Sequence, residues 1–475
     1  MLVLVSMGPV AALVGPPSFL IWAASAVIGL LMALAFAELI ASYPKESGGI
    51  GMLSARVLQS GHPRLALLSR WSYWFGWCPA LAINSLLFGT YLQQILVPKT
   101  PGWMSALFAG AVLAASFTLN TFGLRHSASL QVLLAACVAV GVALLTIGPV
   151  VAGQFDVHNL TPFAPPGGWT SATGVVAIGG ALFIAGWSAY GSELALSYGT
   201  EYSGGARAAV GVMVAIAIVS VITYAAVPLV LVGTVGVARI QEDPAIALIP
   251  LVQHAARGFG ALVLGLLMAG LWLSLNMIMI SSSRLVYQMA RNGDTWITLG
   301  QLNRHGAPAN AMRFDLGVNL MLLAIIVAVN GGRTASVPLA LLAASNVGYF
   351  IAIILALVAA SMVHGRRRSE PGGFRMRPGV IRLGVFLAGV NAVLLVCGGF
   401  AWGWLQLGTG ALLLGAVIII FARSTGRARG ALTVRQRIRC MAWGLRGRSA
   451  TTEELSMLSK ISAKTSPADQ NDAYF

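Results

Sequence analysis

Charged side chains are scarce in this sequence. Asp, Glu, Lys and Arg together make up 9% of the 475 residues, whereas about a quarter of a typical soluble domain is charged. The hydrophobic share is 57%, and the mean hydropathy is +0.81. A large water-soluble core is therefore excluded, and the composition predicts a chain that crosses a lipid bilayer repeatedly.

Cysteines and catalytic motifs are also scarce. Cys78, Cys137 and Cys397 fall in apolar segments and Cys440 in the polar end of the chain, with no spacing typical of a metal site. No apolar segment carries a nucleophile beside a base, and the sequence has no Gly-x-x-x-x-Gly-Lys phosphate loop. We therefore expect no disulfide, no metal, no cofactor and no enzymatic activity.

Long apolar runs fill most of the chain instead. Eleven of them reach the ~20 residues that a helix needs to cross the hydrocarbon core, and residues 1–15 form a shorter segment. The full spans are expected at 17–42, 68–97, 103–123, 127–152, 173–199, 207–233, 258–286, 312–331, 336–363, 380–402 and 403–422. The pattern predicts an all-α polytopic membrane protein with about 12 transmembrane helices. Its transmembrane domain covers residues 1–423, and a basic, polar tail covers 424–475.

The formal net charge of +16 is unevenly distributed along the chain. If the first segment starts in the cytoplasm, 26 of the 30 basic residues fall in cytoplasmic loops or in the tail. This asymmetry follows the positive-inside rule and places both termini in the cytoplasm. The tail is expected to contact anionic lipid headgroups rather than nucleic acid. Arginine outnumbers lysine 26 to 4, which suggests a GC-rich bacterial genome and hence the bacterial inner membrane.

One polar segment, Gly186-Trp-Ser-Ala-Tyr-Gly-Ser-Glu193, interrupts an apolar span. A carboxylate at membrane depth is costly and indicates a ligand or ion site. The glycines at 186 and 191 permit a break in the helix. Glycine is also common where membrane helices pack closely, so both positions have a purely structural interpretation too. The glutamate favours the functional interpretation.

Four other polar residues lie inside the expected spans. Glu38 is near the end of the span at 17–42, where it can pair with loop arginines or reach water, and we expect a helix-end salt bridge. Asn84, Asn276 and Asn346 lie in three further spans. A neutral amide in a helix bundle more often bonds a neighbouring helix than a ligand, so these three are weak candidates for a binding site.

Five runs of residues, taken in order, resemble permeases of the amino acid/polyamine/organocation superfamily over about residues 6–400. The most specific run is Ala35-Phe-Ala-Glu-Leu-Ile-Ala-Ser-Tyr-Pro44, followed by Glu46-Ser-Gly-Gly49. The others are Trp71–Trp77, Leu119–Arg125, Ser281–Gly293 with His305–Asn310, and Gly186–Glu193. The aromatic side chains of Trp71–Trp77 are expected in an interfacial belt.

The resemblance implies a bundle of two inverted five-helix repeats, with helices 1 and 6 broken at mid-membrane, plus two extra helices. Backbone groups freed at the breaks would bind the substrate. The implied substrate-binding residues are Ser6, Met7, Gly8, Gly186, Trp187, Tyr190 and Gly191, with Asn84, Asn276 and Asn346 as weaker candidates. Trp187 falls where the family places an aromatic cap, and Glu193 falls where some exchangers use a carboxylate for coupling or gating.

The expected function is secondary active transport of an amino acid or a small amine by alternating access. The coupling partner is a proton, a sodium ion or an exchanged solute. Only fourteen residues precede Gly15-Pro16, so helix 1 is short, and Ser6-Met-Gly-Pro9 is expected to be its unwound stretch. The alternative that this short helix leaves open is a transport-inactive membrane scaffold or sensor.

Overall fold

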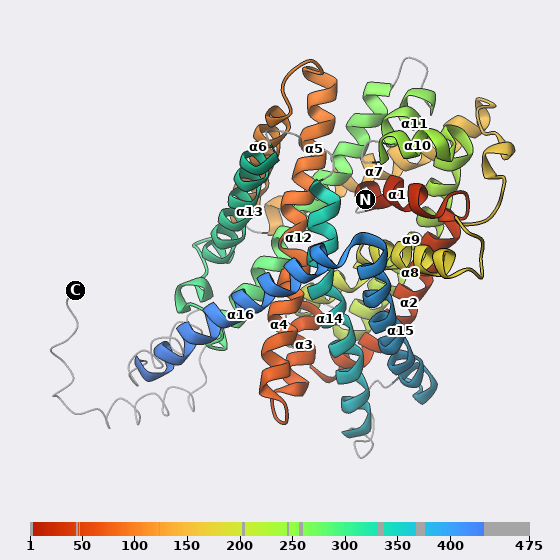
Figure 1. The fold of residues 1–475 in the computed structure, drawn as a ribbon. Helices are drawn as coiled ribbons and strands as arrows, with labels where there is room; N and C mark the ends of the chain where they lie inside the picture. The colour runs from red at the N-terminus through yellow and green to blue at the C-terminus, as the bar shows by residue number, and fades with distance from the viewer. Residues whose placement is uncertain are drawn as a thin grey trace, which may run out of the picture. The chain divides into compact units, whose positions relative to one another are not determined.

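The computed structural model describes residues 3–43, 46, 48–122, 124–201, 205–244, 247–255, 260–330, 337–366 and 376–431. All regular elements in these ranges are helices, which confirms the all-α prediction (Figure 1). The chain divides into two compact units, Met1–Phe421 and Ala422–Phe475. Residues 432–475, which make up most of the second unit and of the basic tail, lie outside the described residues.

Eleven helical segments among the described residues are long and apolar enough to cross a membrane, as predicted. In a helix the backbone N–H and C=O groups bond to each other, which is required in a membrane because lipid chains offer them no hydrogen-bond partners. In chain order the spans are α2 (Ser18–Ser42), α4 with α5 (Pro63–Trp77 and Ala80–Leu96), α6 (Trp103–Thr121), α7 (Leu124–Val151), α8 (Ala172–Ala189), α9 (Gly205–Val235), α12 (Gly260–Arg291), α13 (Ala309–Asn330), α14 (Val337–Arg366), α15 (Pro378–Trp402) and α16 (Trp404–Ala431). Shorter helices are α1 (Val3–Val14), α3 (Gly49–Leu58), α10 (Val237–Glu242), α11 (Leu248–Ala255), and the 3₁₀ segments η1 (Val157–Leu160), η2 (Gly191–Glu201) and η4 (Ile297–Gly300).

The first helix differs from the expectation. The predicted unwound stretch, Ser6 to Pro9, lies inside the continuous helix α1, so this prediction is wrong. Proline removes one N–H donor from a helix, and here the helix continues through Pro9. A side chain at Gly8 would overlap the carbonyl group of Pro244, so Gly8 serves close packing against the segment after α10.

The span at 63–96 is interrupted, which the sequence analysis did not predict. Pro79 has no N–H group to donate, and the helix turns at Cys78 and Pro79 between α4 and α5. The N–H of Ala82, near the start of α5, donates to Asn319 Oδ1 on α13 at 2.9 Å. A side chain from another helix thus satisfies a donor near the interruption.

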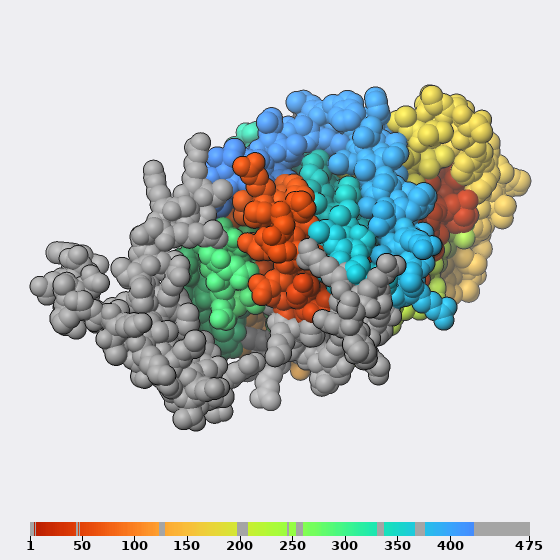
Figure 2. All heavy atoms as spheres, turned by 90° about the horizontal axis from the view of Figure 1, so that it is seen from below, coloured from red at the N-terminus to blue at the C-terminus, as the bar shows by residue number. Residues whose placement is uncertain are grey.

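The short helix α3 also went unpredicted. Gly48 and Gly49 both have positive φ angles, 98° and 71°, which let the chain turn sharply into α3. Nine of the ten residues of α3 are buried. Figure 2 shows the end of the molecule at which α3 and α4 lie, in orange, between the green region of α12 and α13 and the cyan region of α14. A ten-residue helix is too short to give a membrane-span signal, so sequence pattern alone treated it as a loop.

Candidate functional site

The break in the span at 172–196 lies four residues after Gly186. The α-helical part, α8, ends at Ala189, Tyr190 forms a turn, and the chain continues as η2 from Gly191. A 3₁₀ run of this length is uncommon and often marks a hinge or a strained segment. Glu193 is the third residue of η2 and is 1% exposed.

Three aromatic side chains hold the carboxyl group of Glu193. The Tyr73 hydroxyl donates to Oε2 at 2.5 Å, and Trp77 Nε1 donates to Oε1 at 3.1 Å, both from α4. The Tyr349 hydroxyl, from α14, donates to Oε1 at 3.1 Å. Hydrogen bonds to an ionised acceptor are about twice as strong as neutral ones. No basic side chain in the described part of the chain forms an ion pair with Glu193.

An aromatic wall surrounds this carboxyl group. The rings of Trp77 and Trp187 are 5.6 Å apart, and those of Trp77 and Tyr349 are 5.1 Å apart. Trp187 Nε1 donates to the carbonyl oxygen of Gly76 at 3.1 Å, so the predicted cap is anchored on α4. All three rings are at most 1% exposed.

The aromatic residues at the start of the expected span at 68–97 are therefore not an interfacial belt. Trp71, Tyr73, Trp74 and Trp77 are all less than 5% exposed, and two of them bond Glu193. Sequence reasoning missed Tyr73, Trp77 and Tyr349 as site residues. The available signal was the spacing of Tyr73 and Trp77, since residues four apart lie on one face of a helix.

Glycines let the backbone approach closely around the break. A Cβ atom on Gly186 would lie 3.0 Å from the Tyr190 ring and 3.1 Å from the Phe350 ring. A Cβ atom on Gly29, in α2, would lie 2.9 Å from the carbonyl oxygen of Ala189. Gly186 thus has the packing role that the sequence left open, and it lies within α8 rather than at the break itself.

Three more of the predicted residues join the region of the break to other helices. Ser6 Oγ lies 3.4 Å from Ser188 Oγ, which brings α1 to the end of α8. The rings of Tyr190 and Phe350 are 6.1 Å apart. Asn346 Nδ2 donates to the carbonyl oxygen of Phe183 in α8 at 2.6 Å.

For the other four predicted residues, the contacts seen in the structure lie away from the break. Asn84 Nδ2 donates to the carbonyl of Ala80 in its own helix at 2.8 Å. Asn276 Oδ1 accepts from Asn120 Nδ2, on α6, at 2.8 Å, which is a bond between helices. Met7 is fully buried in the apolar core, and Gly8 packs near Pro244.

Glu38 is a helix-end partner, but its partner is a histidine rather than a loop arginine. Its Oε1 lies 3.2 Å from His364 Nδ1, near the end of α14. Its Oε2 accepts the backbone N–H of Met376 at 2.8 Å. Both partners lie away from the aromatic wall, so Glu38 is separate from the Glu193 cluster.

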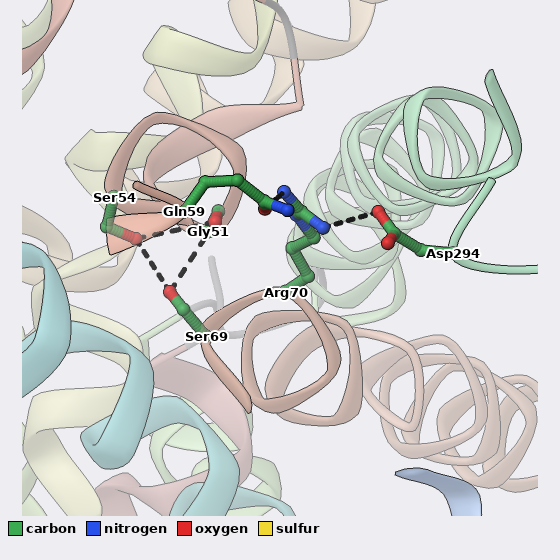
Figure 3. Close-up of polar contacts among 6 residues, drawn as sticks. All are labelled: Gly51, Ser54, Gln59, Ser69, Arg70 and Asp294. Atoms are coloured by element: carbon green, nitrogen blue, oxygen red, sulfur yellow. Dashed lines mark hydrogen bonds and ion pairs between the residues drawn. The ribbon is translucent and has the colours of Figure 1, made fainter. Parts of the chain in front are cut away.

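A second polar network ties α3 to α4 and to the segment after α12 (Figure 3). Arg70 is 5% exposed and lies within α4. Its Nη1 donates to Asp294 Oδ2 at 2.5 Å, and its Nη2 donates to Gln59 Oε1 at 2.6 Å. Beside it, the hydroxyls of Ser54 and Ser69 are 2.6 Å apart. The network fixes the position of α3, which packs against η2.

The fold and the site together define a multi-pass, all-helical membrane protein with a buried carboxyl group beside a broken helix. No group of three or more His, Cys, Asp or Glu residues that could hold a metal ion occurs in the searched, described residues. The Glu193 site offers hydrogen-bond donors and aromatic faces around a carboxyl group.

Comparison with known sequences identifies the family. The amino acid permease family model matches residues 1–423, and the chain belongs to this family, which confirms the predicted resemblance. The chain is also 25% identical over 311 residues to the lysine-specific permease LysP of Escherichia coli (strain K12). The matched region covers 60% of this chain and 60% of that permease, which is less than two thirds of its length.

Proposed function

We propose that the protein is a secondary active transporter for an amino acid or a small amine and works by alternating access. The observation that carries the proposal is the Glu193 carboxyl group, buried at a helix break and held by α4 and α14. A buried acidic group in a membrane segment is costly and is characteristic of substrate and ion pathways. Membership of the amino acid permease family supports the same class of substrate.

The chemistry around Glu193 favours a substrate that carries an ammonium group. A carboxylate attracts an ammonium ion directly, and the faces of Trp77, Trp187 and Tyr349 attract it through cation–π contacts worth ~0.5–2 kcal/mol. The similarity to a lysine-specific permease supports this preference. We therefore propose a cationic amino acid or an amine as the first substrate to test, with a proton, sodium or an exchanged solute as coupling partner.

The contacts of Glu193 also suggest how the site opens. The hydrogen bonds of Tyr73 and Tyr349 cross from intact helices to η2, and the Trp187 bond to Gly76 crosses from α8 to α4. A substrate ammonium that pairs with Glu193 competes with these donors. Loss of the cross-helix bonds then frees η2 to move relative to α4, which links binding to a change in access.

An uptake panel in proteoliposomes tests the proposal. The purified full chain is offered labelled L-lysine, L-arginine, putrescine, L-leucine and L-glutamate, with imposed proton or sodium gradients and with each solute preloaded for exchange. We expect saturable uptake of at least one cationic solute, lost in Glu193→Gln and retained in Glu242→Gln, which changes an exposed carboxylate. Uptake of none of the five under any gradient contradicts the proposal.

One observation favours the second candidate, a membrane scaffold or sensor without transport. In α1 the stretch Ser6–Pro9 is helical, so its backbone groups are engaged within the helix rather than free for a substrate. The same panel separates the candidates, because a scaffold gives no uptake with any solute. We further propose the inner membrane as the location, both termini in the cytoplasm, and lipid headgroups as partners of the 424–475 tail.

A further inference from the structure

A second buried carboxyl group lies outside the cluster around Glu193. Asp315, on α13, is fully buried. Trp74 Nε1 donates to its Oδ1 at 2.9 Å. The thiol of Cys78 and the hydroxyl of Ser282, on α12, also face this carboxyl group. No sequence motif marked Asp315, and the proposed substrate site does not use it.

No cation neutralises Asp315 within the described residues. The helices α5 and α6 and the segment η4, which pack against α13, contain no acidic or basic residue. Among the described residues, no arginine of α4, α12 or α13 forms an ion pair with Asp315; these arginines are Arg64, Arg70, Arg284, Arg291 and Arg313. Arg70 pairs with Asp294, Arg291 bonds Tyr287, and Arg313 bonds Asn310. A buried carboxylate needs a neutralising partner. The groups around Asp315 indicate whether that partner is a proton or a metal cation.

The surroundings of Asp315 suit a proton better than a metal cation. The Trp74 indole presents only a donor, whereas a serine hydroxyl can both donate and accept. Neither Asp315 Oδ2 nor Ser282 Oγ makes a hydrogen bond in the described structure. The Ser282 hydroxyl can donate to the carboxylate and can accept from the carboxylic acid, so both protonation states have a partner. A hard metal ion would instead need several oxygen ligands.

The two buried carboxyl groups share one segment of α4. Tyr73 and Trp77 face Glu193, while the residues that directly follow them, Trp74 and Cys78, face Asp315. A shift or rotation of this segment therefore changes both sets of contacts together. We infer that Asp315 is a proton-binding site, coupled to the Glu193 site through residues 73–78 at the end of α4.

The coupling step rests on the proposed transport function, but the proton site does not. The proton comes from water and adds to one carboxylate oxygen of Asp315, giving a neutral carboxylic acid, and it returns to water when the acid ionises. Because Asp315 is fully buried here, the exchange takes place when the contact between α4 and α13 opens. Movement of α4 during transport would then bind or release one proton.

Infrared spectroscopy tests the proton site without any substrate. The purified full chain is titrated with acid and base, and difference spectra record the carbonyl stretch that only a protonated carboxyl group gives. We expect Asp315→Asn to lose one such band that Glu193→Gln retains. Spectra in which Asp315→Asn loses no carboxyl band overturn the inference.

A second pair of variants covers the case in which Asp315→Asn does not fold. Ser282→Ala removes the only hydroxyl that faces Asp315 among the described residues and should shift the pH at which the band titrates. Ser281→Ala, equally buried at 2% exposure, is the matched control and should leave the band unchanged. An identical titration in both serine variants overturns the inference as well.

Transport then tests the coupling. With a solute that the uptake panel identifies, Asp315→Asn should keep exchange but lose accumulation driven by a proton gradient. Full gradient-driven accumulation in this variant rejects the coupling through α4. If the panel finds no transported solute, the proposed function fails, while the infrared titration still decides whether Asp315 binds a proton.

Discussion

The Tyr73 hydroxyl donates a 2.5 Å hydrogen bond to Glu193 Oε2, joining two residues that are 120 positions apart in the chain. Tyr73 lies on the regular helix α4, whereas Glu193 lies just after the break at Tyr190. The bond therefore connects a rigid element to an irregular one. Any movement of η2 relative to α4 must stretch or break it, which makes this contact the natural place to test the proposed function.

Replacement of Glu193 by glutamine should affect transport more than folding. The change keeps the size of the side chain and removes its charge, so the protein should still reach the membrane. Uptake should be lost or uncoupled from its driving ion. Uptake and its pH profile are measured beside the amount of protein in the membrane. Normal uptake with an unchanged pH profile contradicts this prediction.

Removal of the Tyr73 hydroxyl should weaken both stability and transport. A hydrogen bond to a charged group contributes about 1.5–3 kcal/mol, so Tyr73→Phe should lower the thermal stability of the purified protein. Tyr91→Phe is a matched control, because Tyr91 is equally buried and its hydroxyl has no hydrogen-bond partner among the described residues. Equal effects of the two substitutions would show that the Tyr73 bond contributes nothing.

Truncation of Trp187 should weaken the apparent affinity for substrate. A desolvated cation–π contact is worth up to ~2 kcal/mol, and ~1.4 kcal/mol corresponds to tenfold, so Trp187→Leu should weaken affinity by up to roughly thirtyfold. Trp187→Phe keeps an aromatic face and should be milder, although it also loses the bond to Gly76. Uptake measured against substrate concentration gives the apparent affinity of each variant. Identical affinities in the parent and in both variants would remove Trp187 from the site.

The buried ion pair of Arg70 and Asp294 should matter far more than an exposed one. Asp294→Asn removes the carboxylate charge that faces the buried Arg70, and breaking a buried ion pair costs about 3–5 kcal/mol of unfolding free energy. Glu46→Gln is the control, because its partner Arg56 is 3.6 Å away and 60% exposed, and such surface pairs contribute about 0–1 kcal/mol. The stability of the two purified variants is compared by unfolding them in detergent. Equal losses would argue against a structural role for the buried pair.

Labelling of single cysteines tests the membrane topology. The excess of basic residues predicts that Arg377 lies on the cytoplasmic side and His158, in η1, on the outer side. In intact cells, an impermeant thiol reagent should label His158→Cys and spare Arg377→Cys, in a background without the native cysteines. The reverse pattern contradicts the predicted orientation.

Hydrophobic periodicity and length predicted the spans well, because each span must satisfy its own backbone in lipid. Such patterns are local, so the polar segment Gly186–Glu193 also predicted that the span at 172–196 is interrupted within those residues. In the structure α8 ends at Ala189 and the turn lies at Tyr190, four residues after Gly186. The same local pattern wrongly predicted unwinding at Ser6–Pro9, where contact of Gly8 with the segment after α10 accompanies a continuous helix.

The sequence by itself determined the class of protein and the number of spans and marked Glu193 as a candidate site residue, because composition and polarity follow from each residue alone. Only the tertiary structure decided which side chains meet that group. Tyr73, Trp77 and Tyr349 reach it from α4 and α14, and Trp74 with Ser282 meets Asp315, across separations in the chain that no local pattern records. Such contacts depend on which helices pack together, and packing is a property of the whole bundle rather than of any single segment.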